Sequence, residues 1–281
     1  AKPKHNIMHK FTLEILFQII GIGSASGLVY HNEKLYLISD NSTFLYEYSI
    51  PTEKLNKIAL VENAQDNIAK KDKPDFEAIA LKGNDLVVLG SGSTQNRNKV
   101  VKYDMNSKKI QERNFEKMYE KIKSQLHISA DELNIEGLIV TAETIYFFQR
   151  GNGTNGKNGI IYANDDAENQ VFQFVPFDLP KIKNIPTTFT DAVLVNDTIY
   201  FLASAEDTTS TYLDGEVLGS IIGTIDLKTM KLTGSVQISA TNKFEGLTLY
   251  KQSENEIEFL LCEDTDSELL ESNIYKLVIR D

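Results

Sequence analysis

The chain has 281 residues, of which 41% are hydrophobic and 25% charged, as expected for a soluble globular protein that can bury a sizeable core. The formal net charge of −11 argues against nucleic acid and anionic membranes as main partners, because both require a basic surface. No stretch approaches the roughly 18 apolar residues of a membrane span. The single cysteine, Cys262, rules out an internal disulfide and leaves the compartment open, although we favour a periplasmic or secreted location over a cytoplasmic one. We expect a monomer.

A short phrase of a small residue followed by an aliphatic one recurs along the chain. It stands at Gly27-Leu28, Ala78-Ile79, Gly137-Leu138, Ala192-Val193 and Gly246-Leu247. The intervals between successive copies are 51, 59, 55 and 54 residues, which is close to a constant period. Such a period indicates a structural repeat.

Each copy opens a similar series of strand-like runs. Second runs occur at 34–39, 85–90, 144–149, 198–203 and 256–261, and third runs at 44–50, 99–105, 159–165, 220–227 and 273–279. The runs are rich in β-branched and aromatic residues, which favour strands. A fourth run follows in the first four copies, at 54–61, 108–115, 170–177 and 231–238.

The fifth copy has only three runs, and an unmatched run stands at the other end of the chain in "FTLEILFQII" (11–20). Pairing this run into the last copy would close the ring and cover an open sheet edge. We therefore predict an all-β fold, a five-bladed β-propeller of four-stranded antiparallel blades that forms one domain over residues 1–281.

One segment departs from the repeat. In "NFEKMYEKIKSQLH" (114–127), apolar residues recur at helical spacing between lysines and glutamates. We predict an amphipathic helix inserted between the second and third blades. Its apolar side would cap or plug the ring, or alternatively would bind a partner.

An acidic residue precedes the small residue in four copies, at Glu77, Glu136, Asp191 and Glu245, and Ser26 takes this place in the first copy. In a propeller the start of the innermost strand and the loop after the second strand share one face. The long polar loops 91–98, 150–158, 204–216 and 262–272 should therefore surround these acids. We call this face the acid-bearing end.

Converging carboxylates repel one another and raise their pKa values unless a cation lies among them. Ligands that are all oxygen, without histidine or cysteine, favour a hard ion, calcium before magnesium. We therefore predict a calcium site at Glu77, Glu136, Asp191 and Glu245. The alternative is structural, because a carboxylate at a strand start can accept hydrogen bonds from backbone N–H groups of the next blade.

The strand openings "DFEAIA", "NIEGLI" and "FEGLTL" resemble those of the bacterial phytase-like and esterase-like β-propeller proteins and, more loosely, of calcium-dependent lactonase propellers. This resemblance implies a metal-assisted hydrolase of phosphoester, ester or lactone substrates. The scarcity of arginine and the absence of histidine from the acid-bearing end favour instead a non-catalytic propeller that binds a small molecule, a glycan or a protein. Candidate ligand-binding residues are Ser26, Asp40, Arg97, Arg150, Glu206 and Glu263.

Overall fold

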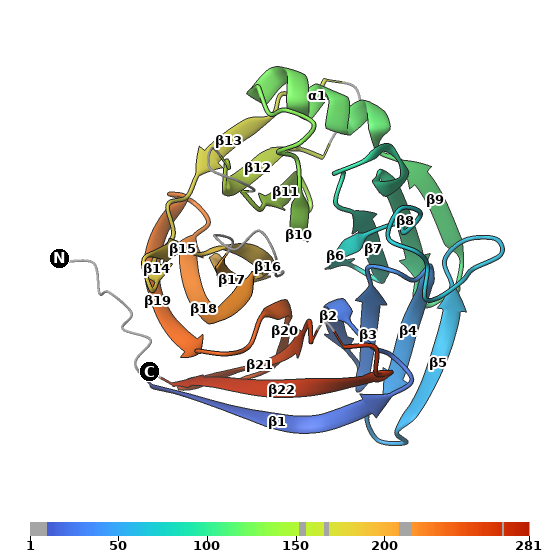
Figure 1. The fold of residues 1–281 in the computed structure, drawn as a ribbon. Helices are drawn as coiled ribbons and strands as arrows, with labels where there is room; N and C mark the ends of the chain where they lie inside the picture. Colours follow the sequence, from blue (N-terminus) through green and yellow to red (C-terminus); the bar gives the residue numbers. More distant parts are fainter. Residues whose placement is uncertain (1–9, 152–155, 166–168, 208–214, 266, 281) are drawn as a thin grey trace.

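The computed structural model describes residues 10–151, 156–165, 169–207, 215–265 and 267–280. Five four-stranded antiparallel sheets are arranged around a central axis (Figure 1), as the repeat predicts. Along the described chain, no helix is long and apolar enough to cross a membrane.

The first four sheets each contain four strands in chain order, with the innermost strand first. The first blade comprises β2 (Ala25–His31), β3 (Lys34–Ser39), β4 (Phe44–Ser49) and β5 (Lys54–Ala59). The second comprises β6 (Phe76–Lys82), β7 (Asp85–Gly90), β8 (Lys99–Asp104) and β9 (Ile110–Asn114). The third comprises β10 (Ile135–Val140), β11 (Thr144–Gln149), β12 (Gly159–Asn164) and β13 (Gln173–Pro176). The fourth comprises β16 (Thr188–Val195), β17 (Thr198–Asp207), β18 (Glu216–Asp226) and β19 (Lys231–Ser239).

The fifth blade is assembled from both ends of the chain. Its inner strands are β20 (Phe244–Gln252), β21 (Glu256–Glu263) and β22 (Glu271–Arg280), and its outermost strand is β1 (Lys10–Ile20). β1 pairs antiparallel with β22 from Lys10 opposite Arg280 to Ile20 opposite Glu271. The predicted closure of the ring by the N-terminal strand is confirmed.

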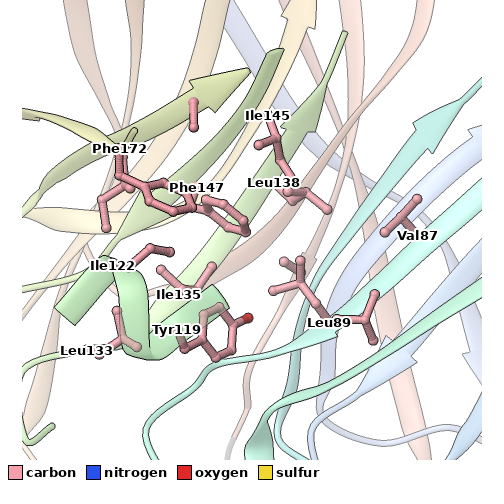
Figure 2. Packing of buried hydrophobic residues seen from close by; sticks show 14 of the residues in the cluster. Val87, Leu89, Tyr119, Ile122, Leu133, Ile135, Leu138, Ile145, Phe147 and Phe172 are labelled. Atoms are coloured by element: carbon pink, nitrogen blue, oxygen red, sulfur yellow. The ribbon is translucent and has the colours of Figure 1, made fainter. Parts of the chain in front are cut away.

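The inserted helix, α1 (Glu116–Leu126), lies on the rim between blades two and three (Figure 1). Its residues Tyr119 and Ile122 are fully buried in the cluster that fills the space between these blades. Figure 2 shows Tyr119 close to Phe147, and the two rings meet edge-on with centroids 6.4 Å apart. The Tyr119 hydroxyl also donates to the Gly90 carbonyl at the end of β7. The apolar side of the helix is therefore used in packing.

Three short elements were not predicted. β14 (Lys181–Ile182) and β15 (Ile185–Pro186) form a small hairpin between the third and fourth blades, and a 3₁₀ turn (Gln95–Arg97) follows β7. Ile182 packs into the cluster between blades three and four. The hairpin therefore closes the outer part of that inter-blade space.

The innermost strands lie close together, and this explains the small residue in the repeated phrase. A Cβ atom added to Gly246 would lie 3.1 Å from the Gly27 Cα of the next blade and 2.5 Å from a methyl group of Leu28. A Cβ atom on Gly137 would lie 3.3 Å from the Ala192 backbone nitrogen. Larger side chains at these positions would push neighbouring blades apart near the axis.

Candidate cation site at one end of the ring

The repeated acid occupies a β-bulge in the innermost strand. In β6 the pairing with β7 passes from Phe76–Gly90 directly to Ala78–Leu89, so Glu77 is the extra residue. Glu136 in β10 and Glu245 in β20 occupy the same place. A bulge redirects the side chain of its extra residue. Three blades therefore present a glutamate in the same local geometry.

These three glutamates meet at the acid-bearing end of the ring. Glu77, Glu136 and Glu245 each offer a carboxylate oxygen, and these oxygens lie within 4.8 Å of one another. The three residues are buried, with exposed fractions of 9%, 5% and 6%. We call this group the glutamate trio. The arrangement has the size and the oxygen chemistry of a site for a hard cation.

Asp191 has a different role in the structure. In the fourth blade the bulge falls one residue earlier, at Thr190, so Asp191 stays in the regular ladder opposite Leu202. Its carboxylate accepts backbone N–H bonds from Ala192 and from Leu247 of the fifth blade, both at 2.8 Å. Such bonds to backbone N–H groups were the alternative to a calcium site in the sequence analysis. Asp191 is not part of the glutamate trio.

Hydroxyl groups occupy the bulge where an acid is missing. Ser26 is the extra residue in β2, and its hydroxyl donates to the Phe76 carbonyl of the second blade. Thr190 makes the equivalent bond to the Phe244 carbonyl of the fifth blade. Ser26 therefore connects the first and second blades.

Burial and mutual repulsion perturb the trio. Burial first and the nearby Glu245 carboxylate second raise the pKa of Glu136 to about 8, while Arg150 opposes the shift. The pKa of Glu77 is raised well above its ordinary value by burial and then by Glu136, and burial also raises the pKa of Glu245. Without a cation, the trio therefore retains protons near neutral pH.

One flank of the trio carries two cationic side chains around Glu206. Arg150 lies 2.8 Å from a Glu206 carboxylate oxygen and 3.9 Å from Glu136. Lys243 lies 2.7 Å from Glu206 and 3.1 Å from Glu245. Although burial opposes it, the pKa of Glu206 is lowered by these two cations. Glu206 therefore remains a carboxylate that holds Arg150 and Lys243 beside the trio.

The opposite flank is built by Lys73, Asp75 and Arg97. Lys73 lies 2.7 Å from Asp40 and 3.2 Å from Asp75, and Arg97 lies 3.4 Å from Asp75. The Ser91 hydroxyl also donates to the Asp75 carboxylate. Asp40, Asp75 and Glu77 form a second group of carboxylate oxygens within 4.8 Å of one another. Glu77 therefore belongs to both carboxylate groups.

The structure brings most of the predicted candidates together. Asp40, Arg97, Arg150 and Glu206 flank the trio, whereas Glu263 accepts hydrogen bonds from Asn242 and Tyr275 and belongs to neither carboxylate group. The loops 150–158, 204–216 and 262–272 are only partly within the described residues. The prediction that these loops surround the acids therefore concerns some residues that lie outside the described ranges.

Sequence reasoning missed Lys73, Asp75 and Lys243. Two of them follow a simple pattern, because Asp75 and Lys243 stand two residues before Glu77 and Glu245. Side chains two residues apart point to the same side of a strand. The phrases "DFE" and "KFE" could therefore have indicated these neighbours.

Unsatisfied polar atoms gather at this end of the ring. Within the described ranges, three buried side-chain atoms lack a hydrogen-bond partner: Glu77 Oε2, Arg97 Nε and Ser204 Oγ. Glu77 and Arg97 belong to the site itself, and Ser204 lies two residues before Glu206 in β17. Native structures leave few buried polar atoms unpaired, so these atoms are suited to interact with a bound ligand or water.

Comparisons with known proteins support the fold and identify a family. The allergen Mala s 1 of Malassezia sympodialis aligns with a TM-score of 0.55 at 11% identity, covering 92% of this chain and 95% of that one. A luciferin-regenerating enzyme aligns with a TM-score of 0.49 at 11% identity, covering 97% of this chain and 98% of that one. At such identities the first likeness concerns the fold alone, and the second carries no argument. No curated protein matches the chain.

Of the expected likeness to phytase-like and esterase-like propellers, the comparisons support the propeller fold. One family model matches residues 21–279, from the segment before the first blade to the end of β22. The chain belongs to this family, DUF6929, which is described as a family of unknown function.

Proposed function

We propose that this propeller binds one hard divalent cation, calcium before magnesium, through Glu77, Glu136 and Glu245. The observation that carries the proposal is the convergence of three buried carboxylates from three blades, one of which has an unpartnered oxygen. Calcium accepts six to eight oxygen ligands, so positions beyond the three carboxylates would be filled by water or by a bound ligand.

We further propose that the acid-bearing end is a binding surface for a small molecule, a glycan or a protein. An ion at the trio would leave open coordination positions, and Arg150, Lys243 and Arg97 border it with side chains 14% to 19% exposed. These side chains are already paired with carboxylates in the protein. They are therefore better suited to orienting a ligand than to carrying a proton through a reaction.

A metal-assisted hydrolase of a phosphoester, ester or lactone is the second candidate. In this function Glu77 and Glu245 would hold the ion, and Glu136 would stay free of it. The raised pKa of Glu136 favours this role, because a free carboxyl group that titrates near neutral pH can exchange a proton with a metal-bound water. Neither carboxylate group contains a histidine. A panel of chromogenic phosphate, ester and lactone substrates, assayed with calcium and with chelator, decides between the two functions.

The cation site is tested by calorimetric titration of chelator-stripped protein with calcium. Binding should release protons, because calcium displaces those retained by the trio, and the number released is obtained by repeating the titration in buffers of different ionisation enthalpy. A net charge of −11 invites weak surface binding, but surface carboxylates that are already ionised release none. A flat titration at millimolar calcium would refute the site.

Glu77→Gln is the most informative variant. It removes the carboxylate that would bind the ion and should abolish the calcium response. In chelator it should melt no lower than the wild type, because the raised pKa keeps the wild-type Glu77 protonated and therefore as uncharged as glutamine. The matched control is Glu254→Gln, which alters an exposed glutamate in the turn between β20 and β21. A normal calcium response in Glu77→Gln would exclude Glu77 as a ligand.

A further inference from the structure

The second carboxylate group adjoins the glutamate trio and shares a member with it. Asp40, Asp75 and Glu77 place carboxylate oxygens within 4.8 Å of one another, and Glu77 is common to both groups. In two-metal sites the ions lie about 3.5–4 Å apart, and a shared carboxylate can bridge them. Glu77 has two oxygens, and its Oε2 has no hydrogen-bond partner. The carboxylates alone would therefore suit a pair of cations.

A cation already stands at the second position. The Lys73 ammonium lies 2.7 Å from Asp40 Oδ2 and 3.2 Å from Asp75 Oδ1, which are two of the three carboxylates of the group. The side chain is only 16% exposed, so the ammonium is held within the site and does not extend into solvent. An ammonium group has three N–H donors, and Asp40 and Asp75 provide partners for two of them.

The charge on this flank also fits an ammonium group in place of a metal ion. Arg97 lies 3.4 Å from Asp75 and supplies a second positive charge to the same group. Lys73 and Arg97 together therefore provide the charge of one divalent ion. On the other side of Glu77, Arg150 and Lys243 contact Glu136 and Glu245 from the flank, and both are also shared with Glu206. The negative charges of the two carboxylate groups are therefore balanced by different pairs of cationic side chains.

We propose that the Lys73 ammonium fills the second cation position of a Glu77-bridged pair, so that the native chain holds one divalent ion beside a tethered ammonium. This inference rests on the proposed cation site at the trio. It predicts that removal of the lysine charge converts a one-ion centre into a two-ion centre. Lys73 thus sets the number of ions bound.

The test is a manganese titration of the wild type and of Lys73→Met and Lys73→Gln, which keep much of the side-chain length without the charge. Calorimetry gives the number of ions, and electron paramagnetic resonance reports whether two Mn²⁺ ions are close enough for their spins to couple. The wild type should bind one uncoupled ion, and both variants should bind two coupled ions. Lys57→Met is the matched control, because Lys57 pairs with one exposed carboxylate, Asp66, and should leave one ion bound.

Variants that still bind one uncoupled ion would overturn the inference while leaving the cation site intact. If the wild type binds none, the proposed function fails, and the inference fails with it because it requires one ion at the trio of the native chain. A variant that folds only with Mn²⁺ also supports the inference, because the ion replaces the lost charge. Failure to fold with Mn²⁺ as well as without it would overturn the inference.

Discussion

In the absence of divalent cations, the glutamate trio should make the free energy of unfolding depend on pH. The Glu136→Gln variant tests this dependence. The pKa of Glu136 is about 8 in the folded protein against 4.5 as its ordinary value, with burial as the main cause and repulsion by Glu245 next. Between these values the folded state binds more protons than the unfolded state. The free energy of unfolding of the wild type must therefore fall as pH rises through this window.

The size of the effect follows from the same shift. A difference of one bound proton changes the free energy of unfolding by about 1.4 kcal/mol per pH unit. Across a window of about three pH units, the wild type should lose about 4 kcal/mol relative to Glu136→Gln, which carries no titrating group at this position. That loss is a large part of the roughly 5–15 kcal/mol that stabilises a typical domain.

Urea unfolding in chelator at about pH 5, 6, 7 and 8 measures both free energies. At each step to higher pH, the free energy of unfolding of Glu136→Gln should rise relative to that of the wild type. The free energy of unfolding of Glu254→Gln should change with pH as that of the wild type does. Calcium should stabilise the wild type most at the upper end of the range, because the deprotonated carboxylates bind the ion. Parallel pH profiles for the wild type and Glu136→Gln would refute a buried, proton-retaining trio.

Three further predictions concern the surroundings of the site. Deletion of residues 10–20 should lower the free energy of unfolding by several kcal/mol, because it removes the ladder with β22 and the buried Ile19. An unchanged melting temperature would contradict the ring closure. Asp191→Ala should cost about 2–4 kcal/mol, because it leaves the buried backbone N–H groups of Ala192 and Leu247 without an acceptor. Calcium affinity measured by calorimetry should be unchanged if its role is structural. Arg150→Met should cost up to about 3 kcal/mol in urea unfolding, because Lys243 still pairs with Glu206; a loss near 5 kcal/mol would show that Lys243 cannot compensate.

The fold could be predicted because its signals are long and repeated. Five small–aliphatic pairs at nearly constant spacing define the blades, and the unmatched run in residues 11–20 is confirmed as the closing strand β1. The β14–β15 hairpin escaped prediction because each strand has only two residues. Two residues are too few to show the alternation by which a strand is predicted.

The site was predictable only to the level of residue type and face. Repetition indicated four equivalent acids, yet the bulge of the fourth blade falls on Thr190 and leaves Asp191 in the ladder. A register shift of one residue turns a side chain to the other face of a strand. The phrase "FTDAVLVN" does carry a signal of that shift, because Phe189 stands two residues before Asp191, whereas Phe76 and Phe244 directly precede Glu77 and Glu245.

A charge count over the described site connects these observations. The two carboxylate groups and Glu206 together contain six acids, and four cationic side chains contact them: Lys73, Arg97, Arg150 and Lys243. Two negative charges therefore remain uncompensated when all six acids are ionised. Protons can supply the missing charge, and the raised pKa of Glu136, caused first by burial and then by repulsion from Glu245, means that this carboxyl group holds one of them. One divalent ion supplies the same charge without protons, so protons and the ion should compete for the glutamate trio.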